Sequence, residues 1–283
     1  MILVFGKTGQ VATALRTVLP EAYFAGRDDA DLSTPAACAD LIVRLAPDAV
    51  INAAAYTAVD AAEEDEATAT VVNGAAPAAM ARACAGLDLP FVHISTDYVF
   101  DGHGDAPFAP AMATGPLNAY GRSKLAGEEA VRAAGGPHVI LRTSWVFSAQ
   151  GANFVKTMLR LGAQRDTLGI VADQYGGPTS ARHIADACQT IVRQLKAAPE
   201  KSGTYHFSGA PDTTWAQFAR TIFESAGLSC TVTDIATADY PTPAARPRNS
   251  RLDCTSTQAA FGIERPDWRA ALFDTIATLK GSA

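Results

Sequence analysis

The chain has 283 residues, of which 48% are apolar and 18% charged, so it is long enough for one large domain or for one domain with a smaller lobe. Its net charge of −6 and its lack of a Lys/Arg run argue against a nucleic-acid-binding surface. No stretch approaches the roughly eighteen apolar residues of a membrane span, and the first residues lack the features of a signal peptide. We therefore expect a cytoplasmic protein without nucleic-acid or membrane partners.

The cysteines and histidines indicate neither a disulfide framework nor a zinc site. The five cysteines are odd in number, lie far apart and form no CxxC pair, which is typical of reduced thiols in the cytoplasm. The five histidines show neither HxxxH nor HExxH spacing. We expect no zinc site among them.

The first predicted strand, residues 2–5, runs into a glycine-containing turn. The segment from Gly6 to Ala12 has the spacing GxxGxxA and is followed by a helical pattern up to Leu19. Glycines at such a turn let the backbone approach a pyrophosphate, and the helix N-terminus offers amide donors. A turn that binds no ligand can have the same spacing. The candidate cofactor contacts here are Gly6, Thr8, Gly9, Gln10 and Val11.

A second predicted strand, residues 22–25, is followed by Arg27. An arginine at this place suits the 2′-phosphate of NADPH, whereas a carboxylate would suit the ribose of NADH. We therefore expect NADPH, with NADH as the alternative, while a solvated loop arginine is the simpler interpretation of Arg27. Asp31 and Leu32 in the next turn complete the candidate contacts on this side, and residues 34–45 are predicted to be helical.

The third and fourth predicted strands also end in candidate site residues. Strand 49–52 is followed by small residues, which either let a cofactor approach the carboxyl edge of the sheet or simply pack tightly; with the tyrosine after them they are Ala53, Ala54, Ala55 and Tyr56. A long helical stretch, 60–85, with a break expected near Asn73 and Gly74, leads to strand 91–95. That strand ends at Thr96, Asp97 and Tyr98. Residues 101–118 are rich in Gly, Pro, Asp and Ala and predict a loop over the site.

Tyr120 and Lys124 follow this loop on a predicted helix, four residues apart and therefore on one face. A lysine ammonium beside a phenol favours the phenolate, so we expect a lowered pKa for Tyr120. An exposed helix with an unrelated tyrosine and lysine would show the same spacing. A strand at 138–142 completes an alternation that predicts an α/β fold with a doubly wound parallel sheet.

Several segments resemble the extended short-chain dehydrogenase/reductases, which have a Rossmann-like fold: residues 6–11, 52–55, 95–100 and 120–128. Later segments are similar to the dTDP-4-dehydrorhamnose reductase family: residues 142–147, 153–154, 173–179, 240–244 and 246–250. The resemblance covers nearly the whole chain. The first group of segments marks the superfamily, and the second group carries the specificity.

The resemblance implies the last step of dTDP-rhamnose biosynthesis, in which NADPH or NADH reduces the C4 ketone of dTDP-4-dehydro-L-rhamnose. Tyr120 would protonate the developing alkoxide. Lys124 would hold down the pKa of that tyrosine and bind the nicotinamide ribose. Thr96 would donate a hydrogen bond to the carbonyl oxygen.

The candidate substrate contacts come from both halves of the chain. Asp97 follows Thr96, and Trp145 lies where an indole could stack on a sugar, although a packing role is an even alternative. Arg246 could pair with a diphosphate oxygen, or could form a surface salt bridge instead. Asn153 and Asn249 complete this group.

Beyond residue 145 the strict alternation ends. We predict helices near 153–163, 180–197 and 214–226, strands near 168–171 and 204–207, and an extended arm at 239–250. Residues 1–145 with about 180–200 would form the cofactor domain. Residues of about 146–179 and 201–283 would form a smaller, interleaved lobe for the sugar nucleotide.

Some members of the resembled family form dimers around a magnesium ion held by glutamates. The corresponding positions here are Ala14 and Arg182, which cannot serve as ligands of a hard cation. We therefore expect no magnesium, and either a monomer or a homodimer held without metal.

Three other functions stay open at this point. A nucleotide-sugar epimerase or dehydratase could share the fold, although dehydratases usually carry Asp-Glu after the active-site threonine, where this chain has Asp97 and Tyr98. A reductase could act on another 4-keto sugar nucleotide. A catalytically silent NADP-binding subunit is the third possibility, against which Thr96, Tyr120 and Lys124 argue.

Overall fold

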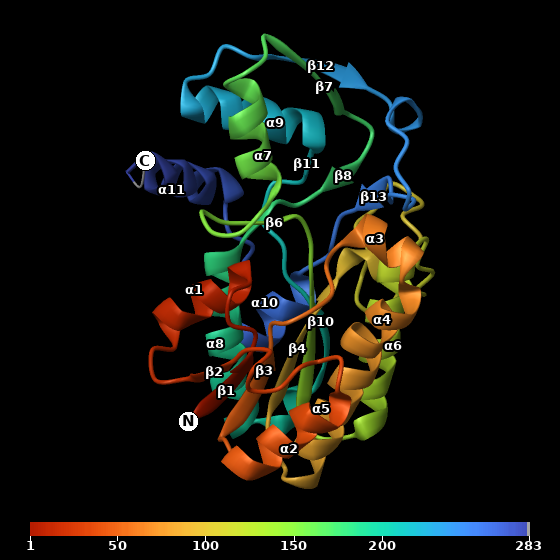
Figure 1. Ribbon diagram of the computed structural model, residues 1–283, viewed down its shortest axis with the longest axis vertical. Coiled ribbons are helices and arrows are strands. Elements are labelled where there is room, and N and C mark those ends of the chain that lie inside the picture. Colours follow the sequence, from red (N-terminus) through yellow and green to blue (C-terminus); the bar gives the residue numbers. More distant parts are fainter. Residues whose placement is uncertain (282–283) are drawn as a thin grey trace.

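The computed structural model describes residues 1–281 and is built on one parallel sheet with helices on both faces, below a smaller lobe (Figure 1). The six strands lie in the order β10-β5-β4-β3-β1-β2, and every neighbouring pair is parallel. The strands are β1 (Ile2–Phe5), β2 (Tyr23–Ala25), β3 (Ala49–Asn52), β4 (Phe91–Thr96), β5 (His138–Thr143) and β10 (Gly203–His206). The predicted α/β fold with a doubly wound sheet is confirmed.

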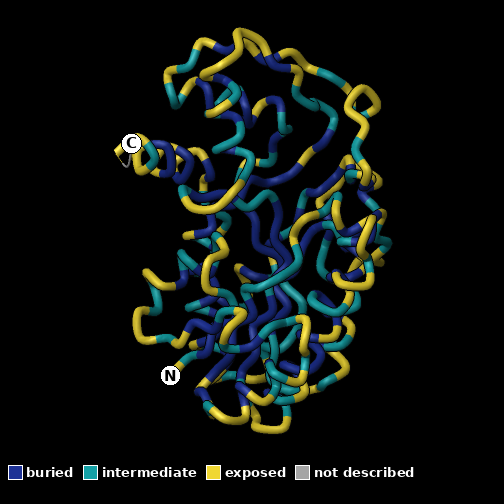
Figure 2. Tube along the Cα trace, in the orientation of Figure 1, coloured by how far each residue is buried: buried dark blue, intermediate teal, exposed yellow. Residues whose placement is uncertain are grey.

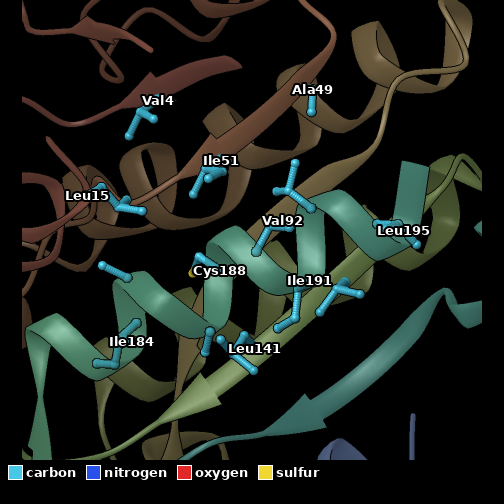
Figure 3. Close-up of a cluster of buried hydrophobic side chains, with 14 of the residues drawn as sticks. Val4, Leu15, Ala49, Ile51, Val92, Leu141, Ile184, Cys188, Ile191 and Leu195 are labelled. Carbon is cyan, nitrogen blue, oxygen red and sulfur yellow. The ribbon is translucent and has the colours of Figure 1, made fainter. Parts of the chain in front are cut away.

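Two apolar layers hold the helices against the sheet. Side chains alternate along each strand, so Val4 and Ile51 face one layer while Leu3 and Val50 face the other. The first layer joins the strands to α1 (Gln10–Val18), α8 (Ala181–Ala197) and α10 (Thr255–Phe261). The second joins them to α2 (Pro35–Leu45), α5 (Ala76–Gly86) and α6 (Ala119–Ala134). Figure 3 shows α8 laying Ile184, Cys188, Ile191 and Leu195 onto the strands.

The helical stretch expected at 60–85 is divided into several pieces. It consists of α3 (Val59–Glu64), α4 (Glu66–Thr70), the π-helical turn η1 (Val71–Ala75) and then α5. The predicted break at Asn73 and Gly74 coincides with the π turn. Helix α6 packs closely there, since a Cβ on Gly127 would lie 2.1 Å from the Asn73 carbonyl oxygen. The wider turn places the Asn73 side chain inside the protein, where it is 1% exposed.

The smaller lobe has its own apolar core, made by α7 (Phe154–Gly162), α9 (Trp215–Ala226) and α11 (Trp268–Gly281). It contains the pair β7 (Thr167–Val171) with β12 (Thr231–Ile235), and the sheet β11 (Thr213–Thr214), β8 (Tyr175–Gly176), β13 (Asn249–Ser250). The short strands β6 (Val146–Phe147) and β9 (Thr179–Ser180) pair where the chain passes between the two parts. Short turns of 3-10 helix are η2 (Asp97–Val99), η3 (Pro199–Lys201) and η4 (Thr237–Asp239). Figure 2 shows that exposed residues concentrate in the connecting loops.

The boundary between cofactor domain and smaller lobe that we expected at residue 201 does not coincide with the end of the main sheet. Strand β10 pairs with β5 at the edge of the main sheet, and Phe261 of α10 belongs to the core beneath that sheet. Local sequence predicts that a strand forms near 204–207, but its pairing partner lies about sixty residues away, so the sequence did not reveal which sheet it joins. Helix α8 packs on the main sheet, as expected for residues of about 180–200. The division into two functional domains stays a prediction. Within residues 1–281, no helix is long and apolar enough to cross a membrane.

Candidate active site

The candidate catalytic residues meet at the carboxyl edge of the sheet, on the side of the smaller lobe (Figure 1). Thr96 is the last residue of β4, and Tyr120 and Lys124 lie in the first half of α6. That helix begins at Asn118, whose Oδ1 accepts from Gly121 N at 2.8 Å. The Asn118 amide also donates to Ala245 O at 2.8 Å, which ties the 239–250 arm to the start of α6.

The hydroxyl of Thr96 lies between Tyr120 and Asp97. It hydrogen-bonds to Tyr120, which lowers the pKa of the phenol against the effect of burial. It also donates to Asp97 Oδ1 at 3.1 Å and accepts from Tyr98 N at 3.2 Å. The ring of Tyr98 meets that of Tyr120 edge-on, with centroids 5.7 Å apart. The phenol and the hydroxyl therefore face one small volume.

The pKa of Tyr120 is raised to about 12, so the expected lowering is wrong for this structure. Burial is the main cause, and the charge of Asp97 adds to it. Lys124 does not contribute to this shift, and its Nζ donates to Ile94 O at 2.7 Å. Burial lowers the pKa of Lys124 itself to about 8, although the Glu128 carboxylate opposes the change. Tyr120 thus keeps its proton near neutral pH, as a proton donor must.

Asp97 is buried beside the two hydroxyl groups, and burial raises its pKa to about 6. Hydrogen bonds from Ser250 and Thr96 work in the opposite direction. Ser250 was missed as a site residue, although it ends one of the segments that carried the resemblance. Its neighbour Asn249 turns the other way, with its amide donating to Ala106 O at 2.8 Å. Neighbouring residues of a strand face opposite sides, so only one of the two can reach Asp97.

Gly121 lets α6 pack closely against the backbone of η2, next to the site. A Cβ at this residue would lie 2.2 Å from Tyr98 O, a distance at which backbone or helix must move. We expect Gly121→Ala to destabilise the protein by about 1–3 kcal/mol and to lower activity by shifting Tyr120. Gly86, at the end of α5, has open space around it and is the matched control. Thermal unfolding and turnover of both variants test this, and equal behaviour would refute the close-packing argument.

The glycine turn after β1 forms a cradle next to the turn after β3. Gly6 has φ +114, and a Cβ there would lie 3.2 Å from Ala53 O. Gly9 is the N-cap of α1 and carries no side chain that could cover the first amides of the helix. The remaining small residues, Ala54 and Ala55, are half-buried. This cradle fits a dinucleotide pyrophosphate, which binds backbone amides at a helix N-terminus.

Tyr56 and Gln10 are fixed by partners that the sequence did not indicate. Asn73 accepts from Tyr56 N at 2.8 Å and donates to Tyr56 O at 2.9 Å. Gln10 Oε1 accepts from Ser148 Oγ at 3.0 Å and from Asn153 Nδ2 at 2.8 Å. Asn153 thereby links the start of α7 to the candidate cofactor turn. Of the other turn residues, Thr8 is exposed and Val11 packs against the core.

The candidate contacts after β2 lie at the far end of the cradle. Arg27 is exposed, and its charge helps lower the pKa of Asp31, after the stronger effect of hydrogen bonds from Ser33. Leu32 packs against the core. Asp29, which was not predicted, accepts from Gly26 N at 2.8 Å and from the Tyr23 hydroxyl at 2.7 Å, and so shapes the turn that carries Arg27.

Trp145 sits in a strained and tightly packed position. Its φ is +47, and its ring stacks on that of Trp215 with centroids 3.6 Å apart and planes 12° apart. A Cβ on Gly176 would lie 2.6 Å from the indole. Packing therefore accounts for much of its environment, and it remains half-buried.

Arg246 forms the salt bridge that was the simpler expectation. Its guanidinium donates to Asp60 at 2.8 Å and to Ala244 O at 3.0 Å. The bridge ties the 239–250 arm to α3.

A parallel sheet with a glycine cradle after β1, a threonine at the end of β4, and a half-buried tyrosine with a buried lysine on α6 defines a short-chain dehydrogenase/reductase. The family model described as RmlD substrate binding domain matches residues 1–280. The chain belongs to this family, that of the dTDP-4-dehydrorhamnose reductases, so the resemblance seen in the sequence is confirmed.

Individual relatives resemble the chain over almost its full length. The dTDP-4-dehydrorhamnose reductase of Sinorhizobium fredii is 46% identical over 276 residues, which cover 94% of this chain and 93% of the relative. That of Escherichia coli K12 is 40% identical, covering 96% and 95%. The crystal structure of a Clostridium acetobutylicum dTDP-4-dehydrorhamnose reductase has a TM-score of 0.92 at 34% identity, covering 99% of each chain. A Bacillus anthracis dTDP-4-dehydrorhamnose reductase in complex with NADP has a TM-score of 0.90 at 31% identity, covering 98% of each.

Proposed function

We propose that this chain reduces the C4 ketone of dTDP-4-dehydro-L-rhamnose to dTDP-L-rhamnose with NADPH, the last step of dTDP-rhamnose biosynthesis. The observation that carries the proposal is the grouping of Thr96, Tyr120 and Lys124 at one sheet edge, in a chain 46% identical to a dTDP-4-dehydrorhamnose reductase. NADPH supplies the hydride for such a reduction.

Tyr120 and Thr96 act on the oxygen of the ketone. The phenol keeps its proton at neutral pH, because its pKa is raised to about 12 by burial. It can therefore give that proton to the oxygen when negative charge develops there. The Thr96 hydroxyl, which hydrogen-bonds to Tyr120, can rotate to donate to the same oxygen. Lys124 binds the ribose next to the nicotinamide in this proposal.

The cofactor lies along the cradle, with the pyrophosphate against Gly6, Thr8, Gly9, Gln10 and Val11. Ala53, Ala54, Ala55 and Tyr56 line its other side. Arg27, Asp31 and Leu32 lie at the adenosine end, where the exposed guanidinium of Arg27 supports NADPH over NADH. A relative in complex with NADP supports the same choice.

The sugar nucleotide lies between the sheet edge and the smaller lobe. Asp97 and Trp145 contact the sugar in this proposal, and Asn153, Arg246 and Asn249 contribute to the nucleotide side. The salt bridge of Arg246 with Asp60 must open for the guanidinium to pair with a diphosphate.

One assay tests the reaction. The protein is incubated with NADPH and with the dTDP-4-dehydro-6-deoxy-sugar that the upstream epimerase produces. We expect stoichiometric oxidation of NADPH, measured by its absorbance. Other 4-keto sugar nucleotides are the comparison substrates. No oxidation with the dTDP sugar, or faster oxidation with another, would overturn the assignment.

We further propose a cytoplasmic protein that is a monomer or a homodimer held without metal. All five cysteines are free thiols and buried, which suits a reducing compartment. Arg182 pairs with Asp186 at 3.1 Å, and no group of three or more His, Cys, Asp or Glu among residues 1–281 is arranged to hold a metal. We expect EDTA to leave the sedimentation coefficient unchanged; loss of a dimer on adding EDTA would contradict this.

A further inference from the structure

A buried histidine lies behind the lysine of the site and has no part in the mechanism above. His93 on β4 is fully buried, and its Nε2 lies 3.5 Å from Lys124 Nζ. Its Nδ1 lies 3.1 Å from the Asn52 amide nitrogen. We propose that His93, oriented by Asn52, is a positioning residue that sets the protonation state of Lys124. This inference rests on the reduction proposed above.

The backbone fixes which way Asn52 points. Ala54 N donates to Asn52 Oδ1 at 3.1 Å, so the oxygen of the amide is turned toward the cofactor side of β3. The Nδ2 group is then the one that faces His93 Nδ1. An amide N–H can only donate, so Nδ1 must be the accepting nitrogen of the ring.

The other ring nitrogen therefore carries the proton. Burial, with the charge of Lys124, pushes the pKa of His93 well below its usual value, so the ring is neutral. A neutral imidazole has one N–H, and with Nδ1 accepting it lies on Nε2. Asn52 thus makes His93 present an N–H, and not a lone pair, to Lys124.

This N–H disfavours a charged lysine. An ammonium has only donors, and one of them is satisfied by Ile94 O at 2.7 Å. A second N–H of the ammonium, directed toward His93, would point at the N–H of the ring and could not form a hydrogen bond with it. A neutral amine has a lone pair that can accept from it. The opposite tautomer of His93 would offer a lone pair and favour the ammonium. The Asn52 amide therefore decides whether His93 lowers or raises the pKa of Lys124.

Other charged groups around α6 are engaged elsewhere or act in the opposite direction. Glu128, one turn along α6, raises the pKa of Lys124 but is itself bound by Arg142 of β5. The groups facing α6 from η2, α3 and α4 are paired with other residues: Asp97 with Thr96, Asp60 with Arg246, Glu63 with Ala119 N and Glu66 with Arg122. Within α6, Tyr120 hydrogen-bonds to Thr96, and the remaining phenol of η2 is Tyr98. None of these contacts replaces the one between His93 and Lys124.

The consequence for the reaction is a shift in the pH range of activity. Lys124 is the residue that binds the ribose next to the nicotinamide in the reaction proposed above. By weakening the charged form, His93 moves the deprotonation of Lys124, and with it the change in this contact to the cofactor, to lower pH.

Nitrogen NMR of histidine tests the tautomer without any reaction. In protein labelled with ¹⁵N-histidine, we expect the His93 signals to show a protonated Nε2 and an unprotonated Nδ1 at every pH at which the protein stays folded. His93→Phe assigns those signals by their disappearance. A protonated Nδ1 would overturn the proposal even if the enzyme reduces the expected substrate.

The pH dependence of kcat at saturating NADPH tests the effect on Lys124. In Asn52→Asp, one carboxylate oxygen still accepts from Ala54 N. The other oxygen can only accept, so it favours the tautomer of His93 with the proton on Nδ1, and Nε2 then presents its lone pair to Lys124. In this variant, we expect the part of the pH profile of kcat that reports the titration of Lys124 to move to higher pH by about one unit or more. Adding His93→Phe should remove most of this shift. A shift that persists in the double variant would mean that the new charge acts directly, and would refute the role of His93.

His138→Gln is the matched control. His138 begins β5, on the strand next to β4, where it pairs with Phe91. Its Nδ1 lies 2.8 Å from Gly136 O, whereas the partners of Lys124 Nζ are Ile94 O and His93. The pH profile of His138→Gln should therefore equal that of the wild type. A shift of the same size in this variant would contradict a specific role for His93.

Discussion

Tyr120→Phe is expected to lower kcat by about 100- to 10,000-fold, the contribution typical of a positioned acid. The phenol is the group that faces the Thr96 hydroxyl, and burial keeps it protonated by raising its pKa to about 12. Phenylalanine preserves the ring and its edge-on contact with Tyr98, whose centroid lies 5.7 Å away. The fold and the cradle after β1 should therefore be unaffected.

Fluorescence titration with NADPH provides the control for this variant. We expect the dissociation constant to change little, because the cradle formed by Gly6 and Gly9 does not include the phenol. Tyr98→Phe is the matched variant on the neighbouring ring and should retain most activity. A fully active Tyr120→Phe would refute the assignment of the acid.

Glu128→Gln is expected to lower the free energy of unfolding by about 3–5 kcal/mol, because it leaves the charge of Arg142 buried without a partner. Glu128 is fully buried, and its two oxygens accept from Arg142 at 2.8 and 2.6 Å. Ser95 Oγ also donates to it at 2.6 Å. The network fastens α6 to β4 and β5, so its loss should also reduce activity. Urea unfolding measures the effect.

Glu66→Gln, on the neighbouring helix α4, is the matched control. Glu66 pairs with Arg122 of α6 at 2.7 Å, but 43% of its side chain is exposed, so its loss should cost no more than about 1 kcal/mol. Equal destabilisation of the two variants would show that burial does not decide the difference.

The stability contributed by Glu128 also depends on pH. Burial raises the pKa of this carboxyl, but Arg142 outweighs burial, and the net pKa is lowered. A carboxyl with a lowered pKa stabilises the folded state fully above the pKa of the unfolded chain. That stability is lost as the pH falls through the folded value. The wild type should therefore lose stability in acid more steeply than Glu128→Gln.

The sequence predicted the order of elements and the residues at the strand ends. The strand after Met1, the glycine turn, Thr96 at the end of β4 and the pair Tyr120 and Lys124 all follow from local periodicity and short spacings. In a parallel sheet the carboxyl ends of the strands share one edge, so these residues were bound to come together. Helices α10 and α11, in the Ala- and Thr-rich end of the chain, were not predicted.

Contacts between distant segments determined the rest. The sequence could not reveal that β10 pairs with β5, or that Ser250 and not Asn249 turns toward Asp97. It also predicted a lowered pKa for Tyr120, whereas burial raises it. A pKa depends on how much water a folded site excludes and on which charges reach it. The sequence alone determined which groups stand at the sheet edge, and only the tertiary structure decided their protonation, because desolvation arises from the packing of the whole chain.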